Sequence, residues 1–440
     1  MNRRWMRFAV PIVVFVMIAA ACSKKDESST GESGAPTAEN TGKVNILAAV
    51  EPEEAAAIQE IADDQVNPNV DYDAEFEASG NFEQDVQVRG QAGTLDLIML
   101  PQVGTIPTLV QTANAVSLED MGFDIAELED TFGKPFMDLG LVNGEHYAIP
   151  TNINLKSMIW YPKDDFDKAG YEVPETWDDL MALSDQIVAD GGTPWCVGFQ
   201  SEGSTGWPAT DWMEDIMLRT AGPETYDQWW KHEIPFNDPS VQAAAQTFGD
   251  VMFHPDYVLG GAENTPGLAF GDAPLPMFDD PPGCWLHRQA SFINAFFPKD
   301  AKAGVDYDWF PFPSMDTEGG PLFGGEMMMV FRNAPEVKDF MEQFMGTDFQ
   351  CAMGGITAAS RLSPNVNVDS SCYANEILAD SAEVLKEGLE SGSARFDASD
   401  LMPPAVGSGT FWTGMVQYMK GGPDSLDGIL QDIENSWPSS

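Results

Sequence analysis

Aromatic side chains gather beside polar ones in four segments that are rich in glycine or proline. They are Pro194–Cys196 with Phe199, Gly206–Pro208 with Asp211 and Trp212, Cys284–Trp285 with His287 and Arg288, and Gly409–Trp412. A sugar packs the C–H face of its ring on an aromatic side chain, while its hydroxyls bind carboxylate, guanidinium and amide groups. Such segments are typical of loops, which carry most binding residues. Any one tryptophan is more often a core residue, but the group predicts a sugar-binding site.

Catalytic motifs are missing from the sequence. It contains no G-x-x-x-x-G-K-[ST] loop for phosphates, no G-x-S-x-G elbow and no H-E-x-x-H motif. A glycoside hydrolase stays an alternative, because its two carboxylates have no short signature, and Asp211 with Glu326 is the pair to nominate. Since an acidic sequence always offers such pairs, we favour binding without catalysis.

The first 22 residues have the layout of a lipoprotein signal. Arg3, Arg4 and Arg7 precede the apolar run Phe8–Ala21, and Cys22 follows three alanines. This run is shorter than the roughly 20 residues of a membrane-spanning helix. We therefore expect residues 1–21 to be a signal peptide and Cys22 to carry a lipid that anchors the chain outside the cytoplasm. An ordinary signal peptide with an incidental cysteine is the alternative.

The residues after Cys22 are predicted to form a flexible linker. Positions 22–42 contain almost no apolar side chain larger than alanine, so they cannot bury enough surface to become ordered. The folded part is expected to begin near Lys43.

Four cysteines remain after Cys22. An even number in an exported chain indicates two disulfides, for which three pairings are possible. We favour Cys196–Cys284, which would join distant segments, and Cys351–Cys372, which would close a short loop. No pair has C-x-x-C spacing, and the histidines are scattered at His146, His232, His254 and His287. The sequence therefore predicts no metal site and no cofactor.

Acidic residues dominate the charge. The chain has 70 Asp and Glu against 22 Lys and Arg, a formal net charge of −48. Cleavage of the signal peptide would remove three arginines and leave about −51, a charge that repels nucleic acids and anionic lipid headgroups. Nucleic acid is therefore excluded as a partner, and solubility, in a saline habitat for example, is the simplest reason for the acidity.

Strand and helix patterns alternate along the chain and predict an α/β fold with parallel strands. Strands are expected at 44–50, 70–78, 95–100 and 156–161, and helices from Pro52 and over 176–189, 238–253, 333–345 and 425–437. Thr176 and Asp179 have the spacing of a helix-capping pair.

Several stretches resemble the carbohydrate-binding proteins of ABC importers, family 1 of the extracellular solute-binding proteins, and within it the α-glucoside type. They are Gly206–Thr220, Glu233–Pro239, Cys284–Phe292 and Asp400–Trp412. The resemblance implies a two-lobe, class II periplasmic-binding-protein fold with a hinge and an interlobe cleft. It places residues 43–150 and 272–331 in the first lobe and 151–271 and 332–440 in the second.

The resemblance also implies ligand-binding residues. Trp412 matches the family's late aromatic residue, and Trp207 and Asp211 match a loop that reaches the cleft. The other candidates follow strands or lie at the crossing or in the aromatic segments: Glu51, Gln102, Asn152, Asn154, Trp285, Arg288, Glu326 and Phe411.

The implied partners are a small carbohydrate, the transmembrane subunits of an ABC permease and the membrane through the lipid. The chain is expected to be a monomer at the cell surface or in the periplasm. A neutral polyol is favoured over a polyamine, because Arg288 and several amide side chains lie in the candidate segments.

Overall fold

The computed structural model describes residues 40–357 and 360–438. The predicted signal peptide, Cys22 and the linker up to residue 39 lie outside the described residues. Everything described below belongs to one compact unit, Ala35–Ser440. Within the described ranges, no helix has the length and apolar character needed to cross a bilayer.

A six-stranded sheet forms around the first strands of the chain. Its strands are β1 (Lys43–Ala48), β2 (Asp73–Ala78), β3 (Leu97–Leu100), β6 (Ala148–Leu155), β10 (Leu322–Val330) and β11 (Arg395–Phe396). The order is β11-β10-β3-β1-β2, and β6 also pairs with β10. Strand β1 is parallel to β2 and β3, as the sequence predicts, whereas β10 is antiparallel to β3 and β6.

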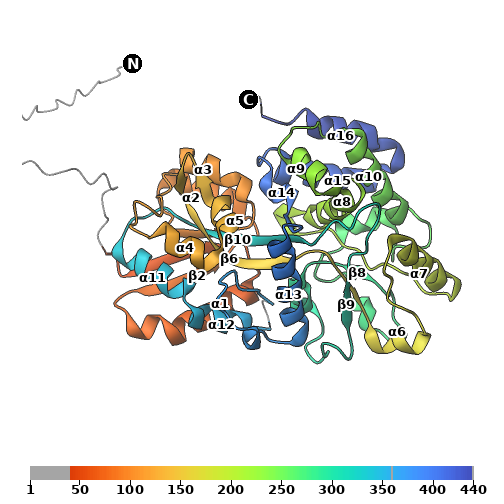
Figure 1. Cartoon of the computed structure of the whole chain (residues 1–440), viewed down its shortest axis with the longest axis horizontal. Coiled ribbons are helices and arrows are strands. Elements are labelled where there is room, and N and C mark those ends of the chain that lie inside the picture. Colours follow the sequence, from red (N-terminus) through yellow and green to blue (C-terminus); the bar gives the residue numbers. More distant parts are fainter. Residues whose placement is uncertain (1–39, 358–359, 439–440) are drawn as a thin grey trace, which may run out of the picture. The chain divides into compact units, whose positions relative to one another are not determined.

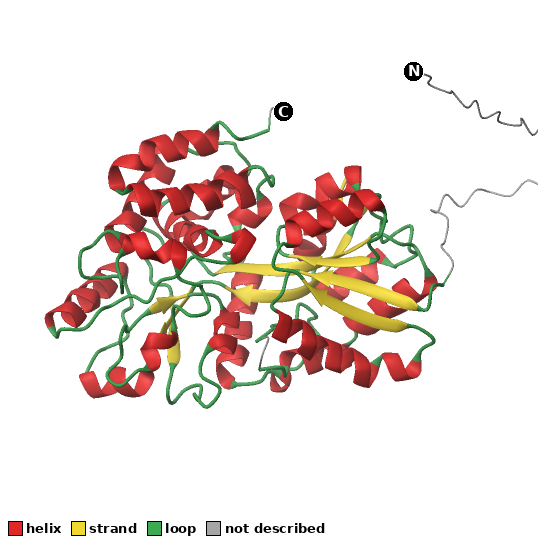
Figure 2. Ribbon diagram, turned by 180° about the vertical axis from the view of Figure 1, so that it is seen from behind, coloured by secondary structure: helices red, strands yellow, loops and turns green. Residues whose placement is uncertain are grey.

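Helices cover both faces of this sheet (Figure 2). On one face they are α1 (Pro52–Gln65), α4 (Ile125–Phe132), α11 (Pro335–Met345) and α12 (Thr347–Gly354). On the other they are α2 (Phe82–Ala92), α3 (Ile106–Thr112) and α13 (Glu376–Ser391). Strand residues alternate between the two apolar clusters: Ile46 packs on the first and Leu47 on the second.

A second group of elements surrounds a small antiparallel sheet. Its strands are β7 (Met158–Tyr161), β8 (His287–Arg288) and β9 (Asp308–Pro311). The helices are α6 (Lys163–Ala169), α7 (Trp177–Ala189), α8 (Trp207–Thr220), α9 (Gly222–Trp230), α10 (Pro239–Met252), α14 (Ala398–Leu401), α15 (Trp412–Gly421) and α16 (Leu426–Glu434). They enclose the largest apolar cluster, which includes Trp195, Trp212 and Trp229.

Strands β6 and β10 connect the two groups (Figure 1). At one end Ile149 pairs with Met328, which also pairs with Met99 of β3. At the other end Leu155 pairs with Phe323, and β7 begins at Met158. The predicted first crossing at Ile149–Asn154 therefore lies within β6.

The contacts assign several segments differently from the sequence-based division. Residues 272–321 were expected in the first lobe, but β9 pairs with β7 and buries Phe310 and Phe312 in the second group. Residues 332–440 were expected in the second lobe, but α11 buries Phe340 and Phe344 against the large sheet. Each segment packs in the group of elements where its apolar side chains are buried. The order of segments in the sequence does not show which group that is.

The predicted elements appear close to their expected positions. The helix expected at 176–189 is α7, and its capping pair is present: the Asp179 backbone N–H donates to Thr176 Oγ1 at 3.2 Å, and Asp179 Oδ2 accepts from the Thr176 N–H at 3.2 Å. Two more predicted helices are α10 and α11.

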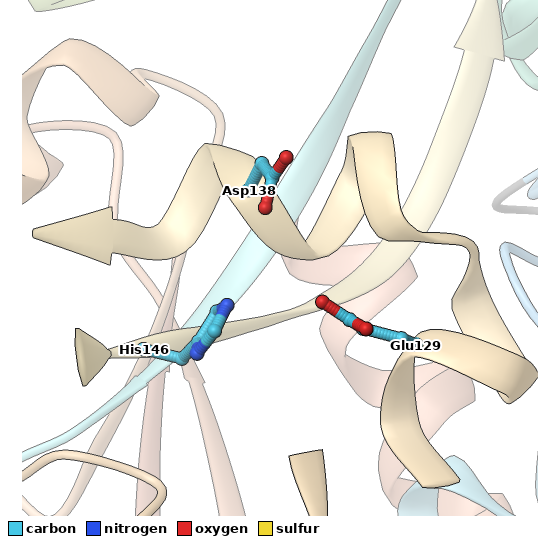
Figure 3. A group of neighbouring side chains, drawn as sticks. All are labelled: Glu129, Asp138 and His146. Atoms are coloured by element: carbon cyan, nitrogen blue, oxygen red, sulfur yellow. The ribbon is translucent and has the colours of Figure 1, made fainter. Parts of the chain in front are cut away.

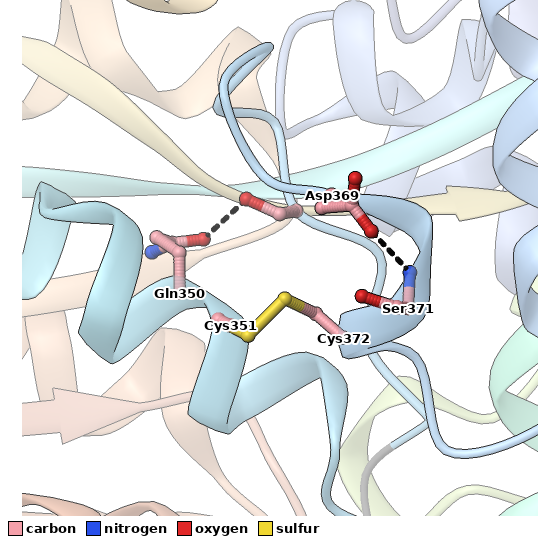
Figure 4. The surroundings of a disulfide bond; sticks show 6 residues. Gln350, Cys351, Asp369, Ser371 and Cys372 are labelled. Carbon is pink, nitrogen blue, oxygen red and sulfur yellow. Dashed lines mark hydrogen bonds between the residues drawn. A yellow bond between two sulfur atoms is a disulfide. The ribbon is translucent and has the colours of Figure 1, made fainter.

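Two disulfides confirm the favoured pairing. Cys196–Cys284 joins the segment before α8 to the segment before β8. Cys351–Cys372 links α12 to a short turn, in which Asp369 Oδ1 accepts from the Ser371 N–H at 2.9 Å (Figure 4). The first disulfide fixes two of the predicted aromatic segments side by side.

Candidate functional site

A cavity of about 330 Å³ is lined by residues from both groups of elements. The sheet with α1 and α2 contributes Glu51, Glu54, Ser79, Glu83, Asn152, Asn154, Lys156 and Glu326. The second group contributes Glu202, Ser204, Trp207, Phe270, Phe292, Phe296, Asp397, Ser399, Asp400 and Trp412. Six of the predicted ligand residues line it: Glu51, Asn152, Asn154, Trp207, Glu326 and Trp412.

One wall of the cavity is aromatic. The Trp207 ring lies 5.2 Å from Phe270 and 5.9 Å from Phe292, and Phe270 lies 5.1 Å from Phe296, measured between ring centroids. Two of these contacts are edge-to-face and the one between Trp207 and Phe292 is tilted, so the rings hold one another in place. The Lys156 ammonium lies over the Trp207 ring, 5.6 Å from its centroid. The sequence analysis did not name Phe270, Phe292 or Phe296 as ligand-binding residues. Phe270 could have been found, because it precedes a glycine, and aromatic residues beside glycine or proline marked the other segments.

Close backbone contact brings the two tryptophans to the cavity. Trp207 begins α8 and Trp412 begins α15. Gly206 precedes α8 at φ +117°, and a Cβ there would lie 2.3 Å from the Trp412 carbonyl oxygen. Only glycine permits both this conformation and this approach. Gly206 therefore sets the distance between the starts of the two helices.

Alternate residues of β6 form a polar wall. Asn152 and Asn154 point to one face of the strand and Lys156 follows at the same spacing, as the period of a strand requires. Asn152 Nδ2 donates to Asn154 Oδ1 at 3.4 Å, while the buried Asn152 Oδ1 has no partner among the described residues. A buried amide oxygen without a partner costs free energy, so it is well suited to accept a bond from a ligand hydroxyl.

Lys156 belongs to a buried network of ions behind the cavity. Its Nζ lies 3.0 Å from Asp211 Oδ1 and also bonds Asp397. Arg288 Nη1 lies 3.2 Å from Asp211 Oδ2, and Arg288 also bonds Asp215. Asp211 and Arg288 are fully buried and do not line the cavity, so these two predicted ligand residues hold Lys156 in position instead.

The network gives its carboxyl groups different proton affinities. Burial raises the pKa of Asp211 to about 6, although Lys156 and Arg288 act in the opposite direction. Burial also opposes ionisation of Asp397, but Lys156 outweighs it and holds that pKa below its usual value. Burial and the nearby Asp397 raise the pKa of Asp400 well above its usual value. Of these two neighbouring carboxyl groups, Asp397 therefore holds its negative charge more readily than Asp400, which lines the cavity.

In a second ion cluster, Arg361 bridges a carboxylate of β10 and one of α1. Arg361 bonds both Glu54 and Glu326 and is 1% exposed. Burial raises the pKa of Glu54 to about 7 against the effect of Arg361. Sequence reasoning placed Glu326 at the cavity but missed Glu54 and Arg361, whose segments are far apart in the chain and give no local signal.

Residues at the cavity edge link the two groups. Ser204 Oγ donates to Glu83 Oε1 at 3.4 Å, from a loop of the second group to α2. Burial, followed by the charge of Glu202, raises the pKa of Glu51. The edge is therefore acidic on both sides.

The remaining predicted residues do not line the cavity. Phe411 packs 4.9 Å from Phe236 and 5.6 Å from Trp229 in the apolar cluster of the second group. Trp285 lies edge-on to Tyr171 at 5.0 Å. Gln102 is buried beside Pro101, which does line the cavity. Phe411 is therefore a core residue, whereas Trp285 is half-buried and packs against the edge of the same cluster.

The hydrolase alternative finds no support in this geometry. Asp211, one of its two nominated carboxylates, is 0% exposed and bound by Lys156 and Arg288. It cannot reach a glycosidic bond in the cavity, whereas hydrolysis needs both carboxyl groups at the substrate.

Comparison with known proteins identifies relatives over most of the chain. The profile of the family described as bacterial extracellular solute-binding protein matches residues 48–348. The α-glucosides-binding periplasmic protein AglE of Rhizobium meliloti is 39% identical, with coverage of 83% of this chain and 80% of that protein. The osmoprotective compounds-binding protein GgtB of Synechocystis is 38% identical, with coverage of 82% and 85%.

Solved structures share the fold. The bacterial solute receptor AcbH superposes with a TM-score of 0.74 at 17% identity, covering 89% of this chain and 97% of that one. Maltose-bound MalE3 of T. maritima gives 0.70 at 16% identity, covering 89% and 99%. These likenesses confirm the two-lobe α/β fold, and together with the match over residues 48–348 they show that the chain belongs to the bacterial extracellular solute-binding protein family.

Proposed function

We propose that the protein binds an α-glucoside or a related small oligosaccharide in the cavity and delivers it to the permease of an ABC importer. The observation that carries this proposal is the composition of the cavity: the aromatic residues Trp207, Trp412 and Phe270 line it together with Asn152 and Asn154. The names of AglE and GgtB support a sugar or a related osmolyte as the ligand.

The aromatic and polar residues of the cavity would bind different parts of a sugar. The aromatic wall would pack on the C–H face of a pyranose, and the amides, Lys156 and Asp400 would bind its hydroxyls. Because the lining comes from both groups of elements, a bound sugar would stabilise the closed arrangement of the lobes. The permease would then recognise that closed form.

Binding without hydrolysis is the expected behaviour, because family members are solute-binding proteins and Asp211 is unavailable to a substrate. A thermal-shift screen with maltose, trehalose and sucrose, combined with an assay for released glucose, tests this point. We expect a shift with at least one sugar and no product. A shift with spermidine alone would favour a polyamine, and released glucose would favour a hydrolase.

The lipid anchor and the monomeric state remain predictions. Cys22 lies outside the described residues, and its role rests on the sequence layout of positions 1–22. We propose that a lipid on Cys22 holds a monomeric receptor at the outer face of the cell membrane. Linker residues up to 42 would then give the folded part freedom to meet the permease.

A further inference from the structure

Three side chains far from the cavity converge on one point (Figure 3). Glu129 comes from α4, Asp138 follows α5 (Lys134–Met137), and His146 ends the short strand β5 (Glu145–His146). Their potential ligand atoms all lie within 4.8 Å of one another. None of the three lines the cavity, so the cluster has no part in the proposed sugar site.

Hydrogen bonds to one carboxylate fix His146 in place. It is 7% exposed, and its Nδ1 lies 2.9 Å from Glu119 Oε1. The Glu119 carboxylate also accepts from the His146 backbone N–H at 3.0 Å, so the imidazole is fixed from two sides. A carboxylate that accepts from Nδ1–H leaves Nε2 with a free lone pair, and metal-binding histidines usually donate their other ring N–H to a carboxylate in this way.

The second ring nitrogen of His146, Nε2, is buried and makes no hydrogen bond to the described residues. The ring reaches toward the space between Glu129 and Asp138 (Figure 3). A buried, unpaired nitrogen costs free energy unless a ligand satisfies it, so its direction toward two carboxylates points to a cation.

Lys134 holds the two carboxylates together. Its Nζ lies 2.6 Å from Asp138 Oδ1 and 3.3 Å from Glu129 Oε1. The side chain is 62% exposed and can swing into solvent at little cost. Lys134 is therefore an internal competitor, because it neutralises the same pair of charges that a metal ion would bind.

We propose that Glu129, Asp138 and His146 form a site for a divalent transition metal, with zinc as the best match. One imidazole nitrogen and two carboxylate oxygens, completed by water, give a tetrahedral set, and the imidazole disfavours calcium and magnesium. Ligand distances of about 2.0–2.2 Å imply ligand-to-ligand separations of about 3.4 Å. Small rotations of the two partly exposed carboxylates close the remaining gap. The bound metal would tie α4, α5 and β5 together at the edge of the first group.

Equilibrium dialysis of the full chain against zinc chloride tests the proposal. High salt and excess magnesium suppress diffuse binding to the acidic surface. We expect one zinc per chain, and affinity at least about tenfold weaker in His146→Gln and in the double variant Glu129→Gln/Asp138→Asn. The double variant changes only partly exposed side chains, so it keeps the test valid if His146→Gln misfolds. Circular dichroism confirms the fold of each variant.

Two further variants serve as controls, one expected to strengthen zinc binding and one expected to leave it unchanged. Lys134→Ala removes the competitor and is expected to bind zinc several-fold more tightly, a gain that loss of a merely structural ion pair would not produce. Glu383→Gln/Glu387→Gln removes two exposed acids of α13 and is expected to leave zinc affinity unchanged. The proposal would be overturned if the wild type bound no zinc, or if the His146 and Glu129/Asp138 variants bound zinc as tightly as the wild type. Weaker zinc binding in Lys134→Ala than in the wild type would also overturn it. Sugar affinity is expected to be the same in all of these variants.

Discussion

At the scale of single residues, the cavity combines groups that sequence reasoning could and could not find. The sequence identifies Trp207 and Trp412 as candidates by their residue type and their neighbouring glycines, and both line the cavity. Asn152 and Asn154 were candidates as polar residues at the predicted crossing, and the alternation of β6 brings both to the cavity. Arg361 could not be found in this way, because its role depends on Glu54 and Glu326, which come from other segments of the chain. Asp400 could not be found either, because Lys156 and Asp211, which act on it, lie far away in the sequence.

Trp412→Ala is expected to weaken sugar binding at least about tenfold, or about 1.4 kcal/mol, because it removes a face on which the ring packs. Isothermal titration calorimetry measures the effect. Trp437→Ala is the matched control: this tryptophan stacks on His232 with ring centroids 4.1 Å apart and does not line the cavity. Equal affinity in both variants, with the fold intact by circular dichroism, would remove Trp412 from the site.

His287 is expected to make stability depend on acidity. It is buried, its Nδ1 bonds the Cys196 carbonyl oxygen at 2.8 Å, and burial lowers its pKa to about 4 from the usual 6.5. The unfolded chain therefore binds more protons than the folded chain between these values, so this contribution is present above pH 6.5 and is lost as the pH falls toward 4.

Urea unfolding of the wild type and of His287→Asn at a series of pH values measures this contribution. We expect the wild type to lose up to about 3 kcal/mol relative to the variant over that window. His254→Asn, at a half-buried histidine, controls for the effect of the substitution itself. A constant difference for His287→Asn would contradict the assignment of a buried neutral imidazole.

At the scale of elements, local patterns predicted helices and strands well, but not their partners. The capping pair Thr176 and Asp179 fixed the start of α7, and the apolar spacing of Val337, Phe340 and Phe344 marked α11. Neither pattern says which core the helix joins. The assignment of α11 to the second lobe failed because its apolar face meets the large sheet, a contact between residues that are far apart in sequence.

Gly206→Ala is expected to reduce both stability and sugar affinity. The new Cβ would meet the Trp412 carbonyl oxygen at 2.3 Å, and the backbone at φ +117° is strained for any other residue. We expect a loss of about 2 kcal/mol or more in the free energy of unfolding. Chemical denaturation and calorimetry measure the two effects.

Gly428→Ala provides the comparison for this substitution. Gly428 lies in α16 with nothing within 4 Å of the added Cβ. Because alanine favours a helix over glycine, we expect unchanged or slightly higher stability and unchanged affinity. If Gly206→Ala behaved like Gly428→Ala, the close approach of α8 and α15 would not position the site.

At the scale of the whole molecule, the sequence predicted the fold class, the disulfides and the exported character, because each leaves a signal in composition or in an extended resemblance. The division into lobes could be predicted only coarsely, since the chain returns to the large sheet through β10, α11, α12 and α13. The cluster of Glu129, Asp138 and His146 gave no signal at all, because three separate elements bring it together.

Cys22→Ala is expected to release the protein from the membrane fraction, because the thiol is the predicted site of the lipid. Fractionation of cells followed by immunoblotting measures the distribution. Cys351→Ala/Cys372→Ala is the control, since it removes the disulfide between α12 and the following turn and leaves the anchor in place. Protein that stays with the membrane after Cys22→Ala would contradict the lipid anchor.

The most direct test of the account is a crystal structure of the protein with the sugar that gives the largest thermal shift. We predict density for a pyranose in the cavity, with one ring face against Trp207 or Trp412 and with hydroxyls on Asn152, Asn154 or Asp400. A sugar bound elsewhere on the molecule, with this cavity filled only by water, would contradict the central claim.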